Sequence, residues 1–228
     1  MPEWLPRRIR RKDSGGWIHV LLNSPMLPLW SVPREWPGET AFIVAGGPSV
    51  ANQNLELLRG RKVIAINSSY ERVPWADILI FGDNRWFREH RDKILTLSCR
   101  LVTVAATAND PKIMRLGKHK PPGMSSDPTR LTMRRTTLSA ALNLAALMGC
   151  IKIVLLGADG KVGANGRAHH HSPHKWPQVE GCWDVQAEEL RTLVDPLKSQ
   201  GIEVLNASPG SAWDMWPIVS LESACAIG

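Results

Sequence analysis

The sequence predicts an α/β fold: a doubly wound, mostly parallel open sheet of the Rossmann type, with helices on both faces. Five short apolar runs end abruptly in small, polar or charged residues, namely Ala41–Ser49, Val63–Ser69, Ile78–Arg85, Ile151–Gly160 and Ile202–Ser211. Runs of this kind, bounded by Gly, Asn and Asp, are typical of buried parallel strands. In such a sheet, ligands bind outside the carboxyl ends of the strands. In this chain, the polar and charged side chains best suited to bind a ligand follow those strand ends.

Composition limits the domain organisation and the class of protein. The chain has 228 residues, of which 43% are hydrophobic, so we expect one domain over residues 40–228 after a basic, Trp- and Pro-rich arm over residues 1–39. No run is long enough to cross a bilayer, and the N-terminus lacks the apolar part of a secretory signal. The spacing of the four cysteines fits neither a disulfide framework nor a metal site. We therefore expect reduced thiols, a cytoplasmic location and no membrane partner, whereas no oligomeric state follows.

Strands and short helices alternate in the first half of the predicted domain. Strands are predicted at Ala41–Ala45, Lys62–Ile66, Asp77–Phe81 and Leu101–Ala106. Helices are predicted at Gln53–Leu58, before the stop signal Gly60, and at Asn84–Leu95. The segment Ala108–Arg130 is rich in proline and long for an internal connection, so it is predicted to be a functional lid.

The second half contains the clearest helix. It is predicted at Leu138–Met148, with Thr136 and Thr137 as candidate caps and Gly149 as its end. Ile151–Leu156 is the most apolar strand, and we expect it to be central. An irregular loop is predicted at Gly160–Trp183. A helix follows at Asp184–Gln200, with Asp184 as its cap and Gly201 as its stop, and the last strand is predicted at Ile202–Leu205.

The loop Gly46-Gly47-Pro48-Ser49 leads from the first strand into a helix. Two glycines let the backbone approach a ligand closely, helix-start N–H groups suit an anion, and Ser49 adds a hydroxyl donor. No Lys-Ser/Thr pair follows, which argues against a P-loop, and the second strand ends at Asn67 instead of the acid of NAD enzymes. The loop therefore predicts a phosphate site; a tight turn without a ligand is the alternative.

Polar residues follow the other strands as well. Asn67, followed by Ser68, has the donor and acceptor needed to read a base edge or a ribose, and the alternative is a turn-forming Asn. Asp83 could hold a ribose hydroxyl or a metal, or cap a helix. Because neighbouring strand ends face one crevice, we expect these residues to bind a nucleotide together. The remaining predicted nucleotide-binding residues are Asn84, Gly157, Asp159, Ser208 and Ser211.

Four histidines within six residues form the other dense cluster, His169, His170, His171 and His174. Histidine suits proton transfer near neutral pH, so a general base or a phosphate contact is the first interpretation. Transition-metal binding and a solvated loop are the alternatives, and no metal site is assigned because no cysteine or carboxylate stands at a tight ligand spacing. The flanking Arg167 and Lys175 suit a departing diphosphate.

These motifs together resemble one superfamily, which contains bacterial sialyltransferases, 6-hydroxymethylpterin diphosphokinase-like proteins and many phage proteins. The likeness rests on strands ending in G-G-P-S, in Asn and in G-D, and on the segment Thr136–Asp159. It also rests on a later loop in which Arg167, His169 and His174 match, and it spans residues 40–222. The ending NASPGS with Leu221-Glu222 is most similar to the phage branch.

The resemblance implies two sets of roles. In the sialyltransferase branch the loop and the Asn hold a cytidine nucleotide, a histidine is the base and no metal is needed. Those roles would fall on Gly46, Gly47, Ser49, Asn67 and His174. In the diphosphokinase branch, ATP with Mg²⁺ donates a diphosphate group. The chain departs from the sialyltransferase pattern in having Gly46 for an Asn, and Thr136-Thr137 for Asn-Ser.

The sequence therefore supports three hypotheses. The first is a glycosyltransferase-like enzyme with a nucleotide-sugar donor, in which His174 or His169 deprotonates an acceptor hydroxyl in DNA or a glycan and Arg167 balances the leaving group. The second is an ATP- and Mg²⁺-dependent diphosphokinase, with the metal on Asp83 and Asp159. The third is a non-catalytic phage or nucleic-acid-associated binding protein. The net charge of +7 points to an anionic partner, DNA included, and no cofactor other than the donor is assigned.

Overall fold

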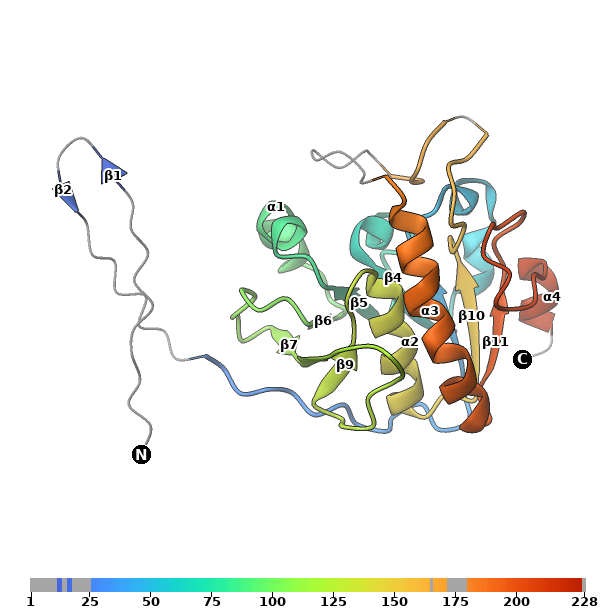
Figure 1. Ribbon diagram of the computed structural model, residues 1–228, viewed down its shortest axis with the longest axis horizontal. Helices are drawn as coiled ribbons and strands as arrows, with labels where there is room; N and C mark the ends of the chain where they lie inside the picture. Colours follow the sequence, from blue (N-terminus) through green and yellow to red (C-terminus); the bar gives the residue numbers. More distant parts are fainter. Residues whose placement is uncertain (1–11, 14–15, 18–25, 165, 172–179, 227–228) are drawn as a thin grey trace.

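The structure is a computed structural model that describes residues 12–13, 16–17, 26–164, 166–171 and 180–226 (Figure 1). Lys12–Asp13 (β1) and Gly16–Trp17 (β2) form a short antiparallel pair. Part of the predicted arm packs on the domain, because Val32 and Trp36 are buried in its core. The Trp36 backbone N–H donates to the Met148 carbonyl over 2.8 Å.

A seven-stranded parallel sheet forms the centre of the molecule, in the order β11-β10-β3-β4-β5-β6-β7. Its strands are β3 (Thr40–Val44), β4 (Lys62–Ile66), β5 (Ile78–Phe81), β6 (Arg100–Thr103), β7 (Ile113–Arg115), β10 (Lys152–Leu156) and β11 (Glu203–Asn206). The chain runs from β3 outward to β7 and then returns to place β10 on the other side of β3. The strand order thus reverses between β3 and β10, and such a switch point opens a crevice at the carboxyl ends.

Helices cover both faces of this sheet (Figure 1), as predicted for a doubly wound fold. The helices α2 (Thr137–Met148) and α3 (Cys182–Ser199) pack on one face. The other face carries α1 (Asn84–Ile94), α4 (Leu221–Ala226) and three 3-10 helices, η1 (Pro48–Asn52), η2 (Leu55–Leu58) and η3 (Asn67–Glu71). Alternate side chains of each strand serve the two layers, so that Ile43 faces α2 and Phe42 faces the opposite layer.

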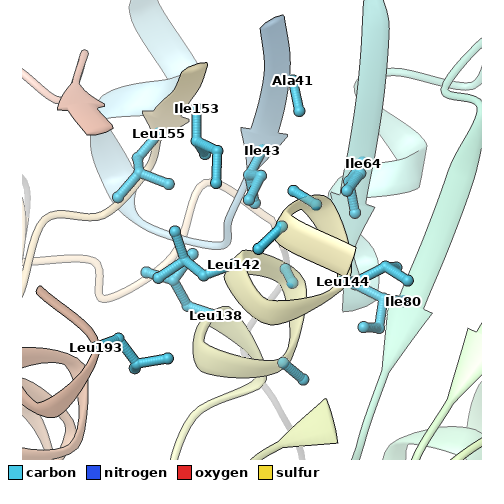
Figure 2. Close-up of a cluster of buried hydrophobic side chains, with 14 of the residues drawn as sticks. Ala41, Ile43, Ile64, Ile80, Leu138, Leu142, Leu144, Ile153, Leu155 and Leu193 are labelled. Carbon is cyan, nitrogen blue, oxygen red and sulfur yellow. The ribbon is translucent and has the colours of Figure 1, made fainter. Parts of the chain in front are cut away.

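The core on the first face is built around α2, which is apolar almost all round. Figure 2 shows Leu138 and Leu142 of this helix between the strand side chains Ile153 and Leu155 and Leu193 of α3. A helix that is apolar on every side has to be covered on every side. Here the sheet and α3 provide that cover. The position of α2 behind the carboxyl ends of the strands is therefore fixed by packing.

Most predicted boundaries of strands and helices lie within two residues of those in the structure. The Thr136 hydroxyl caps α2 by accepting from the Leu138 N–H over 3.2 Å, and Gly149 ends the helix with φ +97°. The four cysteines are free thiols, as expected. Among the described helices, none combines the length and the apolar character needed to span a bilayer.

Three expectations need correction. Ile151–Leu156 was expected to be the central strand, but β10 is second from one edge and β4 is the middle strand. Burial on both faces makes every interior strand apolar, so apolarity does not rank interior strands by position. The predicted helix Asp184–Gln200 begins earlier, because Gly181 is the N-cap and Asp184 lies in the first turn. There its carboxylate still favours the positive end of the helix dipole.

The third correction concerns the predicted lid Ala108–Arg130. It contains the edge strand β7 and the strand β8 (Gly117–His119), which pairs in parallel with β9 (Arg130–Thr132). Strands of three residues are too short to show an alternating pattern. The segment was therefore predicted to be an irregular connection from its proline and glycine residues alone.

The packing of α2 yields a stability prediction. Replacing the fully buried Leu142 by Ala leaves a cavity between α2 and the sheet, and we expect a loss of about 2–5 kcal/mol in the free energy of unfolding. The matched control Ile151→Ala removes as many carbons from a side chain that is 54% exposed, and should cost less than about 1 kcal/mol. Urea denaturation measures both; equal losses would contradict the packing described here.

Candidate functional site

The loops that follow β3 and β10 touch at the switch point. The Gly47 N–H donates to the Gly157 carbonyl over 3.0 Å. A Cβ added to Gly47 would lie 2.0 Å from Asp159 Oδ2 and 2.4 Å from the Gly157 oxygen. Only glycine therefore fits at this point of closest approach.

Asp159 ties the two loops together. Its carboxylate accepts from the Ser49 N–H over 3.2 Å and from the Ser49 hydroxyl over 2.9 Å. Burial raises the pKa of Asp159, and the hydrogen bonds from Ser49 oppose that rise. The Ser49 hydroxyl was predicted to donate a hydrogen bond to a phosphate. It donates to Asp159 instead and thereby fixes the shape of the loop.

His170 anchors the histidine segment to the same strand ends. Its backbone N–H donates to the Gly46 carbonyl over 3.1 Å, and its Nε2 lies 3.0 Å from the Ser69 hydroxyl. That hydroxyl donates to the Ala45 carbonyl, so it accepts from His170, whose Nε2 carries the proton. Burial, together with the nearby His171 and Arg72, lowers the pKa of His170 to about 4. His170 is therefore a neutral structural side chain near pH 7.

His169 and His171, on either side of this anchor, lie over Gly46. Their rings stack with centroids 4.9 Å apart and planes within 7°. A Cβ on Gly46 would lie 3.4 Å from His169 Nδ1 and 3.4 Å from His171 Nε2, so the glycine leaves both imidazoles close to the backbone. His174 and Lys175 lie outside the described residues, and their predicted roles stay predictions.

A cavity of about 1370 Å³ extends from the switch point across the carboxyl ends of β3, β4 and β5. It contains nine of the predicted site residues, namely Gly46, Gly47, Asn67, Asp83, Asn84, Gly157, Asp159, Arg167 and His169. Its described lining is strongly basic, because three carboxylates face seven cations: Arg85, Arg88, Lys118, Arg134, Arg135, Lys161 and Arg167. Such a lining attracts an anionic ligand.

The other predicted residues stand behind this lining and support it. Pro48 starts η1, and Ser68 is buried and accepts from Trp86 Nε1 over 3.0 Å. The Ser208 hydroxyl accepts from the Ala158 N–H over 2.8 Å, and the Ser211 hydroxyl donates to the Ala158 carbonyl over 2.7 Å. Their hydroxyls thus hold the turns after β4, β10 and β11.

Asn67 is the most unusual polar group in the cavity. It adopts φ +49°, the left-handed region that Asn tolerates better than most side chains. Its Oδ1 is buried and has no hydrogen-bond partner among the described residues. A buried acceptor without a partner is costly, and in a cavity wall it is a place where a ligand donor would be stabilised.

Asp83 caps α1. Its carboxylate accepts from the Arg85 N–H over 2.6 Å and from Arg85 Nη2 over 3.1 Å. Burial opposes ionisation of Asp83, but these hydrogen bonds outweigh it and lower the pKa of the carboxyl group.

Among the described residues, no group of three or more His, Cys, Asp or Glu side chains is arranged to hold a metal ion.

Sequence reasoning missed a buried carboxylate that positions two of the cations. Glu189 of α3 is 5% exposed and accepts from the backbone N–H groups of Arg134, over 3.0 Å, and Arg135, over 2.5 Å. The sequence could have indicated the two arginines, because the pair directly precedes Thr136, which caps the clearest helix. It could not have indicated their contact with Glu189, because that contact joins residues more than fifty positions apart.

The two glycines of the first loop should respond differently to the same change. In Gly47→Ala the new methyl group meets backbone and a fixed carboxylate, so we expect a loss of about 1–3 kcal/mol in stability. Gly46→Ala makes only ordinary van der Waals contacts and should change stability by less than about 1 kcal/mol. Thermal melts distinguish them, and equal melting temperatures would disprove the close contact at Gly47.

His170 predicts an acid-dependent loss of stability. Its pKa is about 4 in the folded chain against 6.5 ordinarily, so the unfolded chain binds the proton first as the pH falls. Stability should therefore decrease from about pH 6.5 down to about pH 4, by about 3 kcal/mol from this group. His170→Gln keeps an N–H donor for Ser69 but does not titrate. Its denaturation midpoint should vary less over this range, and an unchanged pH profile would contradict the assignment.

Comparisons with protein-family models, with curated proteins and with solved structures returned no match to this chain. The resemblance to the sialyltransferase and diphosphokinase-like superfamily therefore stays a prediction from the sequence motifs.

Proposed function

We propose that the cavity binds a nucleotide-activated sugar and transfers the sugar to a hydroxyl group of an acceptor. The observation that carries this proposal is the convergence of three kinds of group in one cavity at the switch point. They are the stacked imidazoles over Gly46, the unsatisfied acceptor of Asn67 and the cations that follow β10. A volume of about 1370 Å³ exceeds the roughly 300–1000 Å³ of common ligand sites and leaves room for donor and acceptor together.

The donor lies across the strand ends. The Asn67 Oδ1 accepts from an amino group of the base or a hydroxyl of the ribose, which would satisfy this buried atom. Lys161 and Arg167, both after β10, bind the phosphate groups next to the sugar. The diphosphate thus lies beside the crevice between β3 and β10.

The transfer step needs one base and charge stabilisation. A histidine takes the proton of the acceptor hydroxyl while its oxygen forms a bond to the anomeric carbon. The bond from that carbon to the phosphate oxygen breaks, and the electron pair leaves with the nucleotide phosphate. Lys161 and Arg167 stabilise the charge that develops there, and the histidine later releases its proton to water.

His169 is the described histidine best suited to this role. His169 and His171 both line the cavity, and of the two it is His169 that matches the sequence motif. His170 is committed to Ser69 and, with a pKa of about 4, is a weak base. His171 stacks on His169 and restrains its ring. His174 remains the second candidate from the sequence.

The two carboxylates predicted to hold Mg²⁺ are both engaged in hydrogen bonds within the protein. Both oxygens of Asp83 accept hydrogen bonds from Arg85, and both oxygens of Asp159 accept from Ser49. In the described part of the chain, neither carboxylate belongs to a group of three or more His, Cys, Asp or Glu side chains that could hold a metal ion. The diphosphokinase hypothesis therefore receives no support from these two carboxylates, and the experiment below tests it directly.

A thermal-shift series should identify the nucleotide. The purified chain is melted with CMP, CTP, UDP, UDP-sugars, ATP and GTP, each with and without Mg²⁺. A ligand at about 100 times its Kd stabilises the native state by about 2.7 kcal/mol, or roughly 5–10 °C at this size. We expect a selective shift that does not need Mg²⁺. A Mg²⁺-dependent shift with ATP would favour diphosphoryl transfer, and no shift at all would favour a binding protein without a nucleotide.

Two variants then separate binding from chemistry. Asn67→Gly keeps the left-handed backbone and removes the amide, so it should weaken nucleotide binding by about tenfold or more. His169→Gln should leave nucleotide binding within about threefold and lower the release of nucleotide from the sugar donor by about 10²–10⁴-fold. Calorimetry and a nucleotide-release assay measure the two effects. Unchanged release in His169→Gln would transfer the role of base to another histidine.

A further inference from the structure

The cavity carries more positive charge than one donor requires, and the charge lies in two places. Lys161 and Arg167 follow β10, whereas the second basic group consists of Arg88, Lys118, Arg134 and Arg135. The last two precede α2, Arg88 lies in α1 after β5, and Lys118 lies in β8. Three strand spacings separate β10 from β5, or about 14 Å, so one diphosphate cannot serve both groups.

The second basic group is built on fixed backbone. Glu189 holds the N–H groups of Arg134 and Arg135, as described above. Just before them, the buried Asn143 of α2 accepts from the Thr132 N–H over 2.9 Å. The Met133 N–H donates to the His119 carbonyl over 3.2 Å, which ties this segment to β8 and its Lys118. Three of the four cations, Lys118, Arg134 and Arg135, therefore extend from one hydrogen-bonded part of the backbone.

The charges of this group are not balanced by the part of the chain that the structure describes. No carboxylate of a described residue forms an ion pair with the side chains of Arg88, Lys118, Arg134 or Arg135. Like charges gathered on a concave surface repel one another, and an anion that spans them removes the repulsion. The ligand of this surface therefore has several negative charges spread along its length.

We propose that the second basic group binds the phosphate backbone of a single-stranded nucleic acid, which carries the acceptor hydroxyl. This inference rests on the transferase proposed above. A strand supplies phosphates at successive positions, as four cations on three segments require. A base-paired, stacked nucleotide could not reach the floor of the cavity, whereas an unpaired one can. Trp183, half-buried in the wall, provides an aromatic face for a base.

The overall charge agrees with this partner. The net charge is +7, and the four cations of the second basic group contribute to that excess. A glycan acceptor would be recognised by hydroxyl-binding amides and carboxylates, and would leave the repulsion in this group in place. Glycan binding without strand binding is accordingly an outcome that would overturn the proposal.

Fluorescence anisotropy with labelled single strands of DNA and RNA of about 12 nucleotides tests the proposal, with the matching duplex as comparison. The double variant Arg88→Ala/Arg135→Ala removes two cavity cations. The control Arg59→Ala/Lys198→Ala removes the same charge from exposed positions just before β4 and β11 begin, at the other end of the sheet. A second cavity pair, Lys118→Ala/Arg134→Ala, repeats the test if the first does not fold.

We expect the cavity variant to bind the single strand at least about tenfold more weakly, and to lower the slope of log K against log [salt] by about 1.4. The control should remain within about threefold of the original chain. Equal weakening in both, duplex binding stronger than strand binding, or no binding at about 50 mM salt would each overturn the proposal.

The nucleotide melts, repeated on the same variants, separate this proposal from the transferase. A nucleotide shift without strand binding would leave the transferase and overturn the nucleic-acid acceptor. Strand binding that depends on Arg88 and Arg135, without any nucleotide shift, would support the surface and remove the transferase.

Discussion

The contact between the loops after β3 and β10 determines the form of the site. Gly47 lies against Gly157 and Asp159, and Ser49 holds the Asp159 carboxylate. This contact closes the floor of the crevice where the strand order reverses. Because the floor is closed by backbone and one carboxylate, the cavity extends sideways over β4 and β5.

Buried polar side chains position the exposed functional ones. His170 fixes the segment that presents His169 and His171, and Glu189 fixes the backbone of Arg134 and Arg135. In both cases the buried group makes its hydrogen bonds to backbone or to a neighbouring hydroxyl. These hydrogen bonds join distant parts of the chain in one arrangement of the loops, so they hold the segments that carry the cations and imidazoles in place without a ligand.

The sequence predicted the parallel sheet and nine of the residues that line the cavity, because apolar runs and the residues that end them are local features. It assigned the Ser49 hydroxyl to a phosphate, since a local pattern cannot show that Asp159 lies across the switch point. It also grouped the histidines by spacing alone. Only its hydrogen bonds to Gly46 and Ser69 distinguish the anchor His170 from its neighbours, and those contacts depend on the tertiary structure.

The left-handed backbone of Asn67 places two demands on one residue. Glycine would satisfy the main chain but has no amide, and glutamine would keep an amide but strain the main chain. Aspartate tolerates the conformation, yet it would bring a negative charge into a basic cavity and repel the phosphates of a ligand. Each of these replacements thus preserves one property and loses another, which leaves asparagine as the side chain that combines the left-handed main chain with an uncharged amide at this corner of the cavity.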